Sequence, residues 1–289
     1  MKTIKEVFGE AHQKGIALGH FNVSDLVAFE AITESAREMS LPIFIGLTEG
    51  ERKFFGLENV VALVRMLREK YGYPIFLNAD HHHSLESIKE VVEAGFDSVI
   101  FDASGASFEE NILKTKEVVE WVKSKNPSVL VEGELGYIGS GSEVKKEIPA
   151  GAALEEKDLT SPEQAKEFVE KTGVDLLAPA VGNIHGIIVA DGFQERLNIS
   201  RIKAIREAVS IPLVLHGASG LPVEDFHEAV KAGINLIHIN TEIRVAWKKG
   251  IEEGLKANPD EVAPYKILPG AKEAVKQVVL SKLKLFSGM

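Results

Sequence analysis

The 289-residue chain contains no cysteine. Disulfides, thiolate metal sites and cysteine nucleophiles are therefore excluded, and any protein-bound metal must be held by histidine, aspartate or glutamate. No apolar run approaches the roughly 20 residues that a helix needs to cross a bilayer. The N-terminus also lacks the charged-then-apolar pattern of a secretory signal. We expect a cytoplasmic protein with no membrane partner.

Positive charge is in short supply. The chain has 33 Lys and Arg against 43 Asp and Glu, a formal net charge of −10 at pH 7. This balance argues against nucleic acid as a partner. It does not argue against an anionic small molecule, because a binding site is governed by its local groups. Linker-like and low-complexity segments are lacking as well, so we expect a single domain spanning residues 1–289.

What the chain does contain is a regular alternation of short, apolar, β-branched runs with amphipathic, charged segments. Such runs predict strands buried on both faces, each followed by a helix. Eight strand–helix units in this length predict an α/β fold, a (β/α)8 or TIM barrel. The expected strands lie at residues 17–23, 42–47, 75–79, 98–102, 129–135, 176–181, 213–216 and 235–240.

Two segments interrupt this alternation. The first, at about 136–159, is rich in glycine and charge. It is too long and polar for a tight connection, so we expect a mobile active-site loop. The second is the tail at about 257–289, which we expect to form a C-terminal helical extension that closes the barrel or meets another subunit.

Polar residues stand at the C-terminal ends of the expected strands, where barrel enzymes carry their reacting groups. Three of these ends carry His81, His185 and His216. Histidines from three separate strands can converge, and three neutral imidazoles with one open position form a catalytic zinc site. Imidazole also accepts cobalt or iron, so the metal stays open. The other strand-end groups are Asn22, Ser24, Thr48, Asp80, Asp102, Glu134, Asn183, Asn240 and Thr241.

Acidic residues and glycines surround these histidines. Asp80 directly precedes His81, so it lies near the metal and can face a substrate. Asp102 and Glu134 either orient the histidines or hold a second cation. Glycine-rich turns at 182–186 and 216–220 expose backbone amides, which favours a phosphorylated substrate beside the metal. No strand end carries the desolvated lysine that Schiff-base catalysis requires.

The motifs resemble those of the class II, metal-dependent ketose-bisphosphate aldolases over nearly the whole chain. The resemblance implies a reversible lyase that acts on fructose 1,6-bisphosphate as first choice, with tagatose 1,6-bisphosphate or another ketose phosphate as the alternative. The products would be dihydroxyacetone phosphate and glyceraldehyde 3-phosphate, formed through a metal-stabilised enediolate. Such enzymes serve glycolysis and gluconeogenesis in the cytoplasm as homodimers or homotetramers. The matching segments are Phe21-Asn22-Val23, Asp80-His81-His82, residues 98–102, Gly133-Glu134-Leu135-Gly136, residues 182–186 and residues 215–220.

The resemblance also assigns roles to single residues. Asp80 would carry the proton of the oxygen on the carbon that becomes the aldehyde. The family takes its second base, a glutamate, from the loop after strand five. That loop lacks the usual double glycine and acidic run here, so Glu143 is the candidate and Glu147 the second choice. The zinc ligands would be His81, His185 and His216, with Asp102 and Glu134 as the supporting shell.

The substrate-binding set follows in the same way. Gly186, Gly217, Ser219 and Thr241 would hold the phosphate of dihydroxyacetone phosphate, beside a monovalent cation, Na⁺ or K⁺. Asn22 and Thr48, at the first two strand ends, complete the expected set together with His238 and Asn240. His238 replaces a usual asparagine, and Asn240 stands at a usual aspartate position.

The tail departs from the family pattern. The Asp-Pro-Arg whose arginine meets the distal phosphate is replaced by Val262-Ala263-Pro264-Tyr265-Lys266, which leaves Lys266 as the candidate for that contact. Two other functions stay open: a metal-dependent hydrolase, because His81-x-His83 is a His-x-His pair, and a non-catalytic sugar-phosphate-binding protein on the same scaffold. The roles of His20, His82 and His83 are unassigned.

Overall fold

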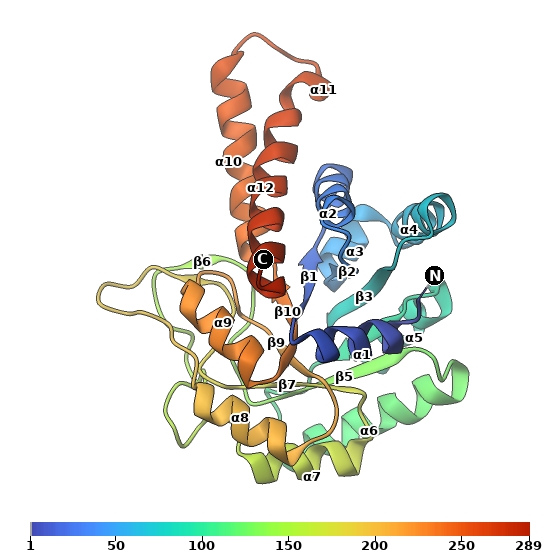
Figure 1. Ribbon diagram of the computed structural model, residues 1–289, viewed down its shortest axis with the longest axis vertical. Helices are drawn as coiled ribbons and strands as arrows, with labels where there is room; N and C mark the ends of the chain where they lie inside the picture. Colours follow the sequence, from blue (N-terminus) through green and yellow to red (C-terminus); the bar gives the residue numbers. More distant parts are fainter. Residues whose placement is uncertain (1) are drawn as a thin grey trace.

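The computed structural model describes residues 2–289 and contains a closed barrel of eight parallel strands with helices around it (Figure 1). Around the barrel the strands follow the order β1-β10-β9-β7-β5-β4-β3-β2. The prediction of an α/β barrel with a C-terminal helical extension is confirmed. The barrel strands are β1 (Leu18–Asn22), β2 (Ile43–Leu47), β3 (Ile75–His82), β4 (Ser98–Phe101), β5 (Leu130–Leu135), β7 (Leu176–Pro179), β9 (Leu213–Leu215) and β10 (Ile234–Ile239).

Helices cover the outside of the barrel because the strands are apolar on both faces and must be buried on both. Large side chains such as Phe29, Phe168 and Phe226 fill the layer between strands and helices. The helices are α1 (Ile4–Lys14), α2 (Leu26–Glu38), α3 (Glu49–Phe55), α4 (Leu57–Tyr71), α5 (Leu85–Ala94), α6 (Phe108–Lys125), α7 (Pro162–Thr172), α8 (Ile199–Ala208), α9 (Val223–Ala232), α10 (Thr241–Ala257), α11 (Pro264–Ile267) and α12 (Pro269–Ser287).

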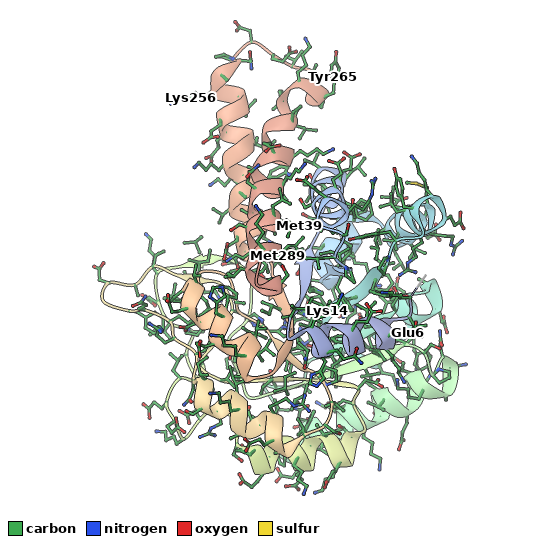
Figure 2. All side chains as sticks on the ribbon, in the orientation of Figure 1. Glu6, Lys14, Met39, Lys256, Tyr265 and Met289 are labelled. Carbon is green, nitrogen blue, oxygen red and sulfur yellow. The ribbon has the colours of Figure 1, made fainter. Side chains whose placement is uncertain are left out.

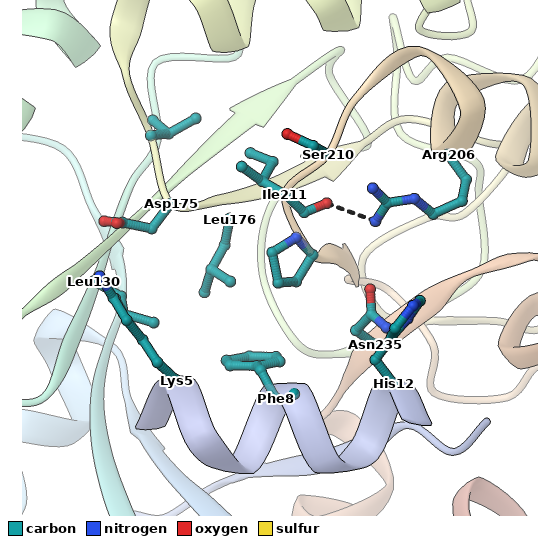
Figure 3. A pocket seen from close by; sticks show the side chains of 13 residues that line it. Lys5, Phe8, His12, Leu130, Asp175, Leu176, Arg206, Ser210, Ile211 and Asn235 are labelled. Atoms are coloured by element: carbon teal, nitrogen blue, oxygen red, sulfur yellow. Dashed lines mark hydrogen bonds between the residues drawn. The ribbon is translucent and has the colours of Figure 1, made fainter. Parts of the chain in front are cut away.

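Helix α1 lies across the N-terminal end of the barrel. Its buried face, which includes Val7 and Phe8, packs on residues near the strand starts such as Phe44 and Phe76. A cavity of about 710 Å³ lies between α1 and the barrel (Figure 3), where Arg206 donates a hydrogen bond to the backbone oxygen of Ile211. This end of the barrel is closed by apolar packing, and the convergent polar side chains lie at the opposite end.

The expected loop at about 136–159 crosses the C-terminal end of the barrel. Within it, β6 (Val144–Lys145) pairs in parallel with β8 (Ile187–Ile188), which follows β7. This two-stranded sheet holds the loop beside the turn that carries His185. Among residues 2–289, the structure has no helix with the length and apolar content required to span a bilayer.

Helices α10 and α12 form a hairpin that projects beyond the barrel, with α11 at its outer end (Figure 1). Figure 2 shows Lys256 and Tyr265 near that end. Lys266 lies in α11 and pairs with Glu261 at 2.7 Å, so it is not among the strand-end groups of its own barrel. The returning half of α12 buries Val279 and Phe286 against α2 and the barrel core.

The hairpin depends on close contact between α10 and α12 at Gly250. A Cβ there would lie 2.5 Å from both the Gly270 carbonyl oxygen and the Ala271 Cα. We expect Gly250→Ala to lower the free energy of unfolding by about 1–3 kcal/mol, because these backbone atoms cannot yield without separating the helices. In α1, a Cβ at Gly9 meets nothing within 4 Å, so Gly9→Ala should raise stability by up to about 1 kcal/mol. Urea denaturation measures both changes, and a stabilised Gly250→Ala protein would contradict this packing explanation.

Candidate active site

Three histidines converge at the C-terminal end of the barrel. His81 belongs to β3, His185 to the turn after β7, and His216 directly follows β9. One ring nitrogen of each lies within 4.8 Å of those of the other two. His81 reaches this position through an irregularity in β3, whose register with β4 shifts between Ala79 and His82. His81 has a left-handed backbone with φ 46°, rare for a residue other than glycine and often found at functional sites.

The irregularity separates the members of the histidine cluster. Successive strand residues normally point to opposite faces, yet Asp80 and His81 both line the site. His82 is fully buried, and its Nδ1 faces the Asp80 carbonyl oxygen at 3.2 Å. The exposed His83 places its Nδ1 3.0 Å from the Asp102 carbonyl oxygen. Only His81 of the three consecutive histidines lies in the group with His185 and His216.

Each of the three histidines has one ring nitrogen engaged by the protein. His185 Nδ1 lies 2.8 Å from the Gly139 carbonyl oxygen, and His216 Nε2 lies 2.6 Å from Glu132 Oε1. His81 Nδ1 lies 2.9 Å from Glu134 Oε1. The ring nitrogens that these contacts do not use are His185 Nε2, His81 Nε2 and His216 Nδ1, and the last two lie 3.1 Å apart. Histidine ligands of a metal are commonly oriented in this way through their second nitrogen.

Two predicted shell residues, Asp102 and Glu134, contact His81, and Glu134 Oε1 also lies 3.6 Å from His216 Nδ1. Asp102 Oδ2 is 3.4 Å from His81 Nδ1, and Ser104 Oγ donates to Asp102 Oδ1 at 2.7 Å. Burial raises the pKa of Glu134 to about 7, although His81 opposes that shift. Asp102, Glu134 and His81 also bring ligand atoms within 4.8 Å of one another. Both roles expected from the sequence, orienting His81 or holding a second cation, are compatible with this geometry.

Glu132 is a site residue that the sequence analysis missed. It is fully buried, and burial followed by repulsion from Glu134 and Asp80 raises its pKa well above the usual range. Its partner His216 has a pKa well below the ordinary value, again because of burial. The available signal was the Glu132-x-Glu134 alternation, which places both acids on the inner face of one strand.

Asp80 is ionised and held in place. Asn22 Nδ2 donates to Asp80 Oδ2 at 2.7 Å. Burial opposes ionisation, but the neighbouring His81 and His238 outweigh it and hold the pKa of Asp80 well below its usual range. Asp80 Oδ1 is buried without a hydrogen-bond partner and lies 3.7 Å from both His81 Nε2 and His238 Nδ1. That oxygen is available to accept a proton from a bound molecule.

His20 and His238 form a stacked pair next to Asp80. They are register partners on β1 and β10, and their ring centroids lie 3.5 Å apart at 7°. His20 fits because Gly46 on β2 has no side chain: a Cβ there would lie 2.0 Å from the ring. Burial lowers the pKa of His238 to about 3, so its ring is neutral. Both of its nitrogens are buried without a partner, which leaves them free for a substrate hydroxyl.

The residues expected to bind the phosphate lie together in one pocket, which the three histidines also line. Gly186 and Gly217 have φ values of 104° and 61°, in the left-handed region that favours glycine. Lys145, another residue missed from the sequence, reaches this turn and donates from Nζ to the His185 carbonyl oxygen at 2.8 Å. The residues that line this pocket are Asn22, Asp80, His81, Ser142, His185, Gly186, His216, Gly217, Ala218, Ser219, His238, Asn240 and Thr241.

A second cavity of about 320 Å³ adjoins this pocket and shares His81, Ser142 and His185 with it. Thr48, which caps α3, and Glu143, on the crossing loop, both line it. So does Arg244, which pairs with Glu51 at 2.6 Å and was missed from the sequence together with it. The lining residues are Thr48, Glu49, Gly50, His81, His83, Asp102, Gly139, Ser140, Gly141, Ser142, Glu143, His185 and Arg244.

Comparison with known proteins decides the family. The class-II fructose-bisphosphate aldolase family matches residues 2–288 of the chain. The chain belongs to this family. It is therefore an enzyme of the lyase class from a metal-dependent family, as the sequence predicted, and the three converging imidazoles suit such a metal.

Individual relatives align with almost the full length of the chain. A probable fructose-bisphosphate aldolase of Bacillus subtilis is 36% identical over 287 residues, which cover 98% of this chain and 96% of that protein. A fructose-bisphosphate aldolase of Staphylococcus aureus is 34% identical over the same shares. The crystal structure of the YdjI aldolase from Escherichia coli K12 superimposes with a TM-score of 0.81 at 33% identity, covering 98% of this chain and 96% of that one.

Glu132 offers a test of how this family member tunes its metal site. Glu132→Leu removes the carboxyl group that contacts His216 Nε2 and orients the ring, so we expect the affinity for a divalent metal to fall about 10–100-fold. Glu132→Gln keeps a hydrogen-bonding side chain at this position, so its affinity for the metal should fall less. Competition with a chromophoric chelator measures both affinities, with the exposed Glu120→Gln on α6 as the charge-matched control. Unchanged affinity in Glu132→Leu would refute the orienting role.

Proposed function

We propose that the protein is a zinc-dependent aldolase that reversibly cleaves a ketose 1-phosphate to dihydroxyacetone phosphate and an aldehyde. Fructose 1,6-bisphosphate, the substrate expected from the sequence, is the reference compound, and tagatose 1,6-bisphosphate or another ketose phosphate is the alternative. The observation that supports this proposal is the convergence of His81, His185 and His216 beside the ionised Asp80.

The donor set suits the metal. Three imidazoles with their second nitrogens engaged match a catalytic zinc site, and the same set also accepts cobalt or iron. When bound, a divalent cation there would act as a Lewis acid that stabilises the negative charge left on the donor half of the substrate. A monovalent cation, Na⁺ or K⁺, beside the phosphate remains part of the proposal.

Two carboxylates would move the protons. In cleavage, Asp80 Oδ1 accepts the hydroxyl proton of the carbon that becomes the aldehyde, and the bond to the donor half breaks. Glu143 then supplies a proton to the donor carbon, and in synthesis it removes that proton. Asn22 fixes the Asp80 carboxylate, while His238 offers its neutral ring to a hydroxyl of the bound sugar.

The phosphate of the donor half would be held by uncharged groups. The backbone amides at Gly186 and Gly217 and the hydroxyls of Ser219 and Thr241 line one pocket next to the histidines. Asn240 lines the same pocket and has a buried side-chain oxygen without a partner, suited to a hydroxyl of the sugar. We further propose that the enzyme acts in the cytoplasm as a homodimer or homotetramer.

Substitution of His185 and Asp80 should separate metal binding from catalysis. We expect His185→Ala to lose bound metal and activity together. Asp80→Ala should keep its metal and lose turnover by about 10²–10⁴-fold, the usual contribution of general acid–base catalysis. Metal content by mass spectrometry and a coupled assay for triose phosphate release provide the two readouts.

Wild-type protein stripped with chelator and reloaded with zinc is the control for this pair. Activity that survives complete metal removal would refute the metal mechanism. Near-normal turnover in Asp80→Ala would refute its role in proton transfer. A pure sugar-phosphate-binding protein would bind the ligand in every state and release no triose phosphate.

Glu143 should act in the donor half-reaction. In Glu143→Ala, exchange of solvent protons into dihydroxyacetone phosphate should fall about 100-fold or more, because the base that removes the donor proton is lost. Nuclear magnetic resonance in deuterated water follows this exchange. Glu147→Ala, also exposed and on the same loop, is the matched control. A loss confined to Glu147→Ala would move the assignment to that residue, and an unchanged rate in both would require another base.

A further inference from the structure

The cavity beyond the metal centre has an unusual charge balance for a site that receives a second phosphate. It shares His81, Ser142 and His185 with the pocket that Gly186 and Gly217 line, but those glycines do not line it, so it can receive the end of a bound ketose that lies away from them. Its lining includes three carboxylates, Glu49, Asp102 and Glu143. Of the described residues that line it, Arg244 is the one with a permanent positive charge.

The positive charge of Arg244 is already compensated. Its Nη2 lies 2.6 Å from Glu51 Oε1, and its Nη1 donates to the Ser142 carbonyl oxygen at 3.1 Å. The Glu51 residue is only 6% exposed, so the pair is poorly screened by water on the glutamate side. A phosphate in this cavity would have to share Arg244 with a buried carboxylate.

Glu51 cannot readily leave this position, because both of its carboxylate oxygens are engaged. Oε2 accepts from Asn22 Nδ2 at 2.8 Å and from the Thr48 backbone amide at 2.9 Å. Oε1 also accepts from Asn240 Nδ2 at 3.2 Å. The bond to Thr48 belongs to the capping box that begins α3, so the carboxylate is fixed by the start of a helix.

From this arrangement, and on the basis of the proposed function, we infer that the cavity takes an uncharged, hydroxyl-bearing segment of the substrate. The aldehyde product is then unphosphorylated at its far end, unlike glyceraldehyde 3-phosphate. Sugar hydroxyls donate hydrogen bonds, and the carboxylates and loop carbonyls around the cavity accept them, whereas a phosphate is repelled. Glu51 is the specificity-determining positioning residue, which acts through Arg244.

Synthesis with a fixed donor tests this inference. Zinc-loaded enzyme receives dihydroxyacetone phosphate and either D-glyceraldehyde or D-glyceraldehyde 3-phosphate, and consumption of the donor is measured. The wild type should show a higher kcat/KM for D-glyceraldehyde, by about tenfold, as expected from one uncompensated charge interaction near a protein surface. The wild-type comparison stands whether or not any variant folds.

Glu51→Gln isolates the charge of this residue. Glutamine can keep the bonds from Asn22 and the Thr48 amide and still completes a capping box. It frees Arg244, so the ratio of KM for D-glyceraldehyde 3-phosphate to KM for D-glyceraldehyde should fall about tenfold. Glu58→Gln, exposed on the neighbouring helix α4, removes the same charge outside the cavity and should leave both sets of constants unchanged.

The outcomes separate the inference from the proposed function. A wild-type preference for D-glyceraldehyde 3-phosphate, or a preference ratio that Glu51→Gln leaves unchanged, overturns the inference alone. Exchange of solvent protons into dihydroxyacetone phosphate requires no aldehyde, so it reports on the proposed function by itself. Absence of that exchange in the zinc-loaded wild type overturns the proposed function, and the inference falls with it.

Discussion

The backbone at the end of β3 is the constraint on which the site depends. A regular strand would turn Asp80 and His81 to opposite faces. The register shift and the positive φ of His81 bring both side chains to one pocket, so that a ring nitrogen of the three-histidine group and a carboxylate oxygen without a hydrogen-bond partner come from adjacent residues. Strain of this kind persists only where surrounding contacts fix it. Here Asp102 and Glu134 both contact Nδ1 of the His81 ring, and Asn22 fixes the Asp80 carboxylate.

Two buried carboxylates contact the rings of His216 and His81 and influence their orientation. Glu132 and Glu134 stand two residues apart on the inner face of β5 and engage different histidines. Burial raises the pKa of both acids, and the neighbouring His81 opposes that rise without cancelling it. A pair of acids inside a barrel is unfavourable unless positive charge lies nearby. The same arrangement that costs stability in the absence of a cation therefore favours the binding of one.

The sequence predicted the parts of this molecule that depend on local pattern. Eight apolar runs predicted the barrel, and histidines at strand ends were recognisable because strand ends meet at one face. Residues that act through a distant partner were not recognisable. Glu132 meets His216 across 84 positions, and Arg244 meets Glu51 across 193. Glu51 also fits an ordinary capping box, so its local role concealed its role in the cavity.

The two pockets of the site differ in the charged side chains that line them. One pocket is lined by the glycine turns and hydroxyl groups expected to hold the phosphate, and Asp80 is the carboxylate among its lining residues. Carboxylates line the other pocket, and the guanidinium of Arg244 is paired with Glu51. A net charge of −10 is therefore compatible with an anionic substrate, because the acids are distributed unevenly around the site. Under the proposed function, such asymmetry would orient a molecule with one charged end: its phosphate would bind among the glycine turns, and the bond to be broken would lie next to Asp80.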